Sequence, residues 1–70
     1  MKGNEFIKRI RKYGKQHGIH VKWMAERGKG SHGTLYLGHH YTVVRNPKDE
    51  LKTGTLNAML KQLDLKKEDI

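Results

Sequence analysis

The sequence contains no cysteine, only one proline and no long apolar run. Without cysteine, disulfides and thiolate zinc sites are excluded, which fits a protein of the reducing cytosol. The segment after residues 1–5 is too polar for a signal peptide or a membrane helix, so we expect a cytoplasmic protein without a membrane partner. Repeats, linkers and low-complexity tracts are also missing. We therefore expect residues 1–70 to form a single domain, with a core too thin for a doubly wound sheet.

Acidic residues are scarce: seven Asp and Glu face 15 Lys and Arg, a formal charge of +8. Residues 1–32 hold nine basic and two acidic residues, a net charge of +7, whereas residues 33–70 have a net charge of +1. A cationic surface attracts polyanions and speeds their arrival. The charge excess lies in the same half of the chain as a glycine-rich stretch.

Hydrophobic periodicity predicts two amphipathic helices. The first covers about residues 4–17, with Asn4 as its N-cap and Gly18 at its end. The second starts near Thr53. Apolar residues recur at helical spacing in both segments: Phe6, Ile7, Ile10 and Tyr13, then Leu56, Met59, Leu60 and Leu63.

Between the helices, apolar and polar residues alternate in three short runs, which predicts strands. The runs are residues 19–26, 32–37 and 41–45, separated by a turn at 27–31 and a connection at 38–40. A turn at 46–49, containing Pro47, ends the third strand. The order helix, three strands, helix predicts a two-layer α+β fold, α-β-β-β-α, with both helices on one face of a three-stranded antiparallel sheet.

The stretch RGKGSHGTLYLG, residues 27–38, contains the motif G-x-G-x-x-G. A dinucleotide-binding site does not fit this motif here, because a predicted strand, not a helix, follows Gly33. One interpretation is a hairpin turn that uses glycine. The other is a phosphate-binding loop, in which Lys29 supplies a cation, Gly30 and Ser31 supply backbone and hydroxyl donors, and His32 exchanges a proton near neutral pH.

Two motifs resemble those of a known family. Gly30-Ser31-His32 follows a predicted strand, and LKTGTL at residues 51–56 leads into MLKQL at residues 59–63. With the element order and the length, these motifs resemble the HicA toxins of bacterial HicA–HicB toxin–antitoxin pairs. The resemblance implies a double-stranded-RNA-binding-domain-like fold, metal-independent endoribonuclease activity on mRNA, and a HicB-type antitoxin partner.

The family's catalytic histidine corresponds to His32. The chain departs from the family pattern at two places: many relatives have a second histidine where this chain has Gly33, and many have Pro and His where it reads Val-Arg-Asn-Pro at residues 44–47. Groups that assist His32 therefore stay unassigned at this point.

RNA carries its own nucleophile, the 2′-hydroxyl group. We expect His32 to act as general base on that hydroxyl or as general acid on the leaving 5′-oxygen. Lys29 and Lys22 would offset charge on the phosphorus oxygens. The alternative for His32 is a polar residue at the start of a strand that contacts only water.

The polar side of the first predicted helix is strongly basic. We expect its cations to be unpaired with local acids and to contact the RNA backbone, although a solvated face is the alternative. They are Lys8, Arg9, Arg11, Lys12 and Lys15. We expect the antitoxin to cover this basic side, which would exclude RNA.

The remaining histidines and aromatics are less specific. No carboxylate or cysteine completes a metal site at the usual spacing with His17, His20, His39 or His40, so we expect neither a metal nor another cofactor. In the predicted register Trp23 belongs to the core face and Tyr36 to the opposite face, where it could stack on a base. The competing functions are a non-catalytic RNA-binding module of similar fold and a structural protein-interaction domain.

Overall fold

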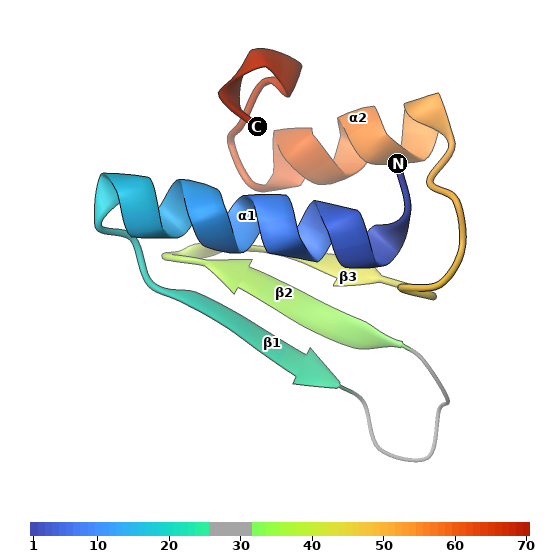
Figure 1. Ribbon diagram of the computed structural model, residues 1–70, viewed down its shortest axis with the longest axis horizontal. Coiled ribbons are helices and arrows are strands. Elements are labelled where there is room, and N and C mark those ends of the chain that lie inside the picture. The colour runs from blue at the N-terminus through green and yellow to red at the C-terminus, as the bar shows by residue number, and fades with distance from the viewer. Residues whose placement is uncertain (26–31) are drawn as a thin grey trace.

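The computed structural model describes residues 1–25 and 32–70. Its elements, in order, are α1 (Gly3–His17), β1 (Val21–Ala25), β2 (Gly33–Leu37), β3 (His40–Val44), α2 (Thr53–Gln62) and a short 3-10 helix, η1 (Lys67–Asp69) (Figure 1). The predicted α-β-β-β-α order of an α+β fold is confirmed. The turn predicted at residues 27–31 and the last residue of the first predicted strand, Glu26, lie outside the described residues.

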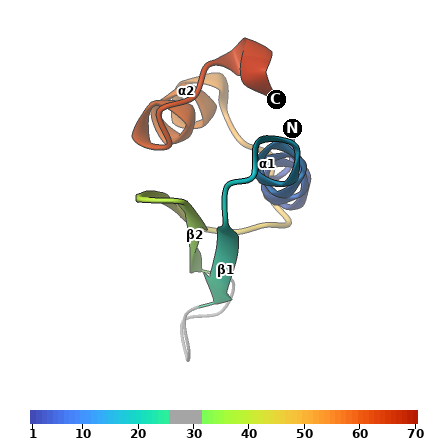
Figure 2. The same ribbon diagram turned by 90° about the vertical axis from the view of Figure 1, so that its left-hand side faces the viewer.

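The sheet is antiparallel, with the strand order β1-β2-β3. Both long helices lie on one side of it, α1 against β1 and β2 and α2 against β3 (Figures 1 and 2). The predicted two-layer arrangement is therefore confirmed, and no helix of the described residues lies over the other face of the sheet, which is called the helix-free face below. None of the helices within the described residues has the length and apolar character needed to cross a membrane.

The core lies between the helices and the covered face of the sheet. Phe6, Ile10, Leu35, Val44 and Leu63 are almost completely buried there. Burying a side chain of this kind contributes ~1.5–3 kcal/mol. The two predicted apolar stripes form the helical half of this core, except that Tyr13 is only partly buried at its edge.

The start of α1 differs from the prediction. Asn4 is not the N-cap, because the helix begins at Gly3 and the residue at the cap position, Lys2, makes no side-chain capping bond. Instead, the backbone N–H of Gly3 donates to the Asp49 carbonyl at 3.1 Å, and that of Asn4 donates to the Pro47 carbonyl at 2.7 Å. The free N–H groups of a helix start need acceptors, and here a distant loop supplies them.

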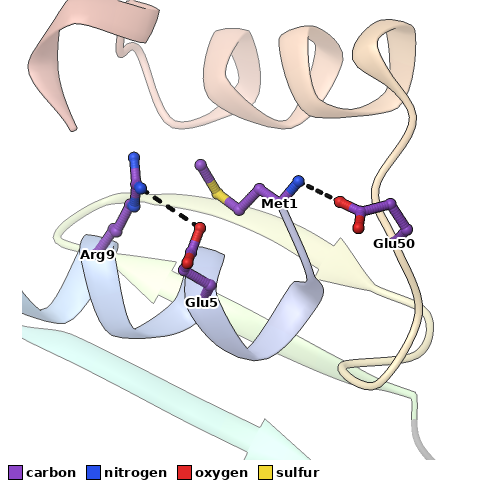
Figure 3. A network of polar contacts seen from close by, with 4 residues as sticks. All are labelled: Met1, Glu5, Arg9 and Glu50. Carbon is purple, nitrogen blue, oxygen red and sulfur yellow. Dashed lines mark hydrogen bonds and ion pairs between the residues drawn. The ribbon is translucent and has the colours of Figure 1, made fainter.

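The same loop holds the chain terminus beside it. The N-terminal ammonium of Met1 pairs with the Glu50 carboxylate (Figure 3), and the Leu51 N–H donates to the Met1 carbonyl at 2.8 Å. Lys2 and Glu50 also form an isolated antiparallel bridge. The connection from β3 to α2 is thereby fixed to the first turn of α1.

The other end of α1 packs closely on the start of β1. Gly14 is buried, and a Cβ atom added there would collide with the Val21 side chain and lie 2.7 Å from the Ile19 carbonyl oxygen. The Ile19 N–H donates to the Gly14 carbonyl at 2.8 Å, so the chain turns directly beneath the helix after Gly18. Because of this turn, β1 begins at Val21 and not at Ile19 as predicted.

We expect Gly14→Ala to lower the free energy of unfolding by ~1–3 kcal/mol, because the added methyl group has no space beside the backbone of residue 19. The matched control is Gly54→Ala in the first turn of α2, where a Cβ atom meets nothing within 4 Å. That variant should be neutral or more stable by up to ~1 kcal/mol. Urea unfolding of both variants measures the difference, and equal effects at the two positions would contradict the packing argument.

Candidate nucleic-acid interface

His32, the proposed catalytic residue, is exposed and directly precedes β2. Side chains alternate between the two faces of a strand. The buried residues of β2 are Gly33, Leu35 and Leu37, whereas Thr34 and Tyr36 point to the face without helices. Continued back by one residue, this alternation assigns position 32 to the helix-free face, at one end of the sheet.

Arg45 is a cation at the same end of the sheet as His32, and the sequence analysis did not identify it. Gly33 lies opposite Val44 in the last pair of the β2–β3 register; His32 directly precedes Gly33 and Arg45 directly follows Val44, and both are exposed. The pairing is fixed by a turn of only two residues, Gly38 and His39, with Leu37 opposite His40. Assuming a two-residue hairpin turn in the sequence would have revealed this neighbour.

Lys22 lies on the helix-free face as well. It is opposite Tyr36, which in turn lies opposite Tyr41, so one cation and two aromatic rings form a row across the sheet. The ring centroids of the two tyrosines are 5.9 Å apart and the rings are tilted by 43°. The predicted separation of Tyr36 from Trp23 is confirmed, because Trp23 packs against the core on the covered side.

The position after His32 has no space for a side chain. A Cβ atom at Gly33 would lie 2.5 Å from the indole ring of Trp23 and 2.8 Å from the Met24 carbonyl oxygen. Trp23 therefore occupies the volume that a larger residue at position 33 would need. This gives a physical reason why the chain has glycine here, where the family resemblance would favour a second histidine.

The basic residues of α1 are all exposed, as predicted. The prediction that none of them pairs with a local acid is wrong for Arg9, whose guanidinium lies 3.4 Å from the Glu5 carboxylate (Figure 3). The two residues are four positions apart and therefore share one side of the helix. An exposed pair of this kind contributes only ~0.3–0.5 kcal/mol, so Arg9 can exchange Glu5 for a phosphate. Among the described residues, no carboxylate forms an ion pair with Lys8, Arg11, Lys12 or Lys15.

The predicted RNA-binding residues are not on one surface. The cations of α1 belong to the helical layer, whereas Lys22 belongs to the helix-free face of the sheet and His32 directly precedes β2. The predicted contributions of Lys29, Gly30 and Ser31 lie outside the described residues.

The remaining histidines lie at the far end of the sheet from His32 or at the end of α1. His39 is in the turn between β2 and β3, and the His17 ring packs on Tyr13 with a centroid distance of 4.2 Å. Within residues 1–25 and 32–70, no group of three or more His, Cys, Asp or Glu is arranged to hold a metal ion.

Comparison with known proteins gives one result that bears on function. Neither the curated proteins nor the solved structures include a significant match to this chain. A model of the family described as "HicA toxin of bacterial toxin-antitoxin" matches residues 3–65, which include both helices, the three strands and His32. The chain therefore belongs to the HicA toxin family of bacterial toxin–antitoxin systems.

Proposed function

We propose that this protein is an endoribonuclease that cleaves mRNA without a metal ion, with His32 as its general acid or base. The observation that carries the proposal is the family match over residues 3–65. The matched segment contains His32, an exposed histidine directly before β2. Membership of a toxin family implies a cognate antitoxin, and we assign this partner to the HicB type.

The reaction uses the substrate's own 2′-hydroxyl group as nucleophile. Its oxygen attacks the adjacent phosphorus while the bond to the 5′-oxygen breaks, which leaves a 2′,3′-cyclic phosphate and a 5′-hydroxyl end. One proton leaves the 2′-oxygen and one is added to the 5′-oxygen. His32 performs one of these transfers, a role that contributes ~10²–10⁴-fold in rate.

Negative charge accumulates on the phosphorus oxygens during the attack, and cations near His32 offset it. Arg45 follows Val44, the partner of Gly33, and so lies at the same end of the sheet as His32; we assign it to the phosphate under attack. Lys22 lies opposite Tyr36, four residues further along β2, which corresponds to ~13 Å of strand. That separation suits a phosphate further along the same RNA strand, beyond the one next to the phosphate under attack. Lys29, Gly30 and Ser31 precede His32 in sequence and complete the proposed set.

The basic side of α1 contributes affinity for RNA in this proposal. Neutralising phosphates releases counterions and dominates binding to nucleic acids. The antitoxin would cover the same side of α1 and so exclude the substrate.

We expect His32→Ala to reduce RNA cleavage by ~10²–10⁴-fold, because the proton transfer loses its positioned group. The measurement is the rate of appearance of 2′,3′-cyclic phosphate ends, with EDTA present throughout. His39→Ala is the matched control, because His39 is another exposed histidine at the opposite end of β2. It should cleave as the wild type does.

Two results would reject this assignment. Cleavage that persists in a folded His32→Ala variant would remove His32 from the mechanism. A wild-type protein that shifts RNA in a gel but never cuts it would instead be a non-catalytic RNA-binding module.

The α1 contact predicts a specific change in salt dependence. For a single strand, the slope of log Kobs against log salt is negative, and its magnitude falls by ~0.7 for each phosphate contact that is lost. The double variant Lys8→Gln, Lys12→Gln should therefore have a slope reduced by ~1.4. A double variant of the exposed Lys61 and Lys67, which has the same change in charge, should keep the wild-type slope. Equal slopes in the two double variants would show that net charge alone, and not α1, governs binding.

A further inference from the structure

The helix-free face of the sheet carries a concentration of exposed apolar surface. In the part of the chain that the structure describes, the exposed large hydrophobic side chains are Met24 (48%), Tyr41 (60%) and Val43 (53%). All three belong to this face, together with Lys22, Thr34 and Tyr36. Apolar side chains gathered in this way on one surface indicate a binding site.

The side chains are arranged in rows that cross the three strands. Lys22, Tyr36 and Tyr41 form one row, and Met24, Thr34 and Val43 form the next. Positions 32 and 45 come two residues further along, at the end of the face. The described strands, residues 21–25, 33–37 and 40–44, contain no acidic residue, and they combine the aromatic rings with the charge of Lys22.

We propose that this face binds the bases of single-stranded RNA, which stack on Tyr36 and Tyr41 while Lys22 contacts the adjoining phosphate. The proposal deepens the proposed function and rests on it for the identity of the ligand as RNA. The two rings are tilted by 43°. They therefore suit one base on each ring better than one base between them. Stacking on aromatic side chains of an open sheet is a general means of holding unpaired bases, and it tolerates any base.

A protein occupant fits these observations less well. The three strands span ~10 Å across and ~16 Å along the sheet. The area of this face is therefore a small fraction of the ~800 Å² that each partner covers in a standard protein interface. A second copy of this chain would also bring Lys22 against Lys22 in a molecule of formal charge +8. Double-stranded RNA fits poorly because its base faces are already stacked inside the helix.

The location of the tyrosines relative to His32 adds a functional consequence. Tyr36 is four residues from His32 on the same face, ~13 Å along the strand. Bases held on the tyrosine pair would guide the strand along the face, and its phosphates toward His32 and Arg45. The face would thus select unpaired RNA for cleavage.

The test is the affinity of the whole protein for short single-stranded 2′-O-methyl oligonucleotides, measured by fluorescence anisotropy. Such oligonucleotides cannot be cleaved through a 2′-hydroxyl group, so the result does not depend on the role of His32. The double variant Tyr36→Leu, Tyr41→Leu keeps apolar side chains but loses the rings, and we expect its affinity to fall at least ~5-fold. The double variant Tyr36→Phe, Tyr41→Phe keeps the rings and should bind within about twofold of the wild type.

An oligonucleotide of equal length without bases separates stacking from charge. It should bind the wild type and the leucine variant equally, because both keep the same cations. Circular dichroism and thermal melting show whether each variant is folded. If the folded leucine variant binds the base-containing strand as tightly as the wild type does, the proposal is wrong. If the leucine variant keeps its affinity for RNA but no longer binds the antitoxin, the face is a protein-binding surface and the proposal is also wrong.

Discussion

The structure depends on burying one face of a three-stranded sheet. Phe6 and Ile10 from α1 and Leu63, just after α2, meet Leu35 and Val44 from the sheet, and these five side chains are almost completely inaccessible to water. A chain of 70 residues has enough apolar helical surface for one layer only. The second face of the sheet is therefore left without a helix from the described part of the chain. This is the face that carries Lys22, the tyrosine pair and the position of His32.

The helical layer is attached to the sheet at both ends of α1. At the start, backbone carbonyls of the loop after β3 accept the free N–H groups of the helix; at the end, Gly14 allows β1 to pass beneath it. These attachments fix β1 and β3 relative to one another through the helix as well as through β2. The neighbourhood of His32 thus follows from strand register, which in turn is supported by the contacts at both ends of α1.

An RNA-cleaving enzyme of this size is chemically reasonable because the substrate supplies the nucleophile. The protein then needs a proton-transfer group, cations near the phosphate and a means of holding the strand. Among the described residues, the charge distribution separates these tasks in space, with a group of cations without an ion-pair partner on α1 and one lysine among apolar side chains on the sheet face. Long-range attraction and local positioning of RNA would therefore come from different layers of the molecule.

Local patterns in the sequence determined which elements form and which face each residue joins. The spacing of Leu56, Met59, Leu60 and Leu63 and the alternation of Trp23 against Lys22 and Tyr36 against Leu35 reflect periods of 3.6 and 2, which are properties of short segments. The motif around His32 is equally local, and it indicated the family together with the motif of residues 51–63, the element order and the length. Contacts between distant segments could not be determined in this way. The start of α1 lies at Gly3 because Pro47 and Asp49 supply its acceptors, and Gly33 pairs with Val44 because the β2–β3 turn is one residue shorter than the sequence suggested. Caps and register depend on which backbone groups meet across the fold, and only the tertiary structure decides that.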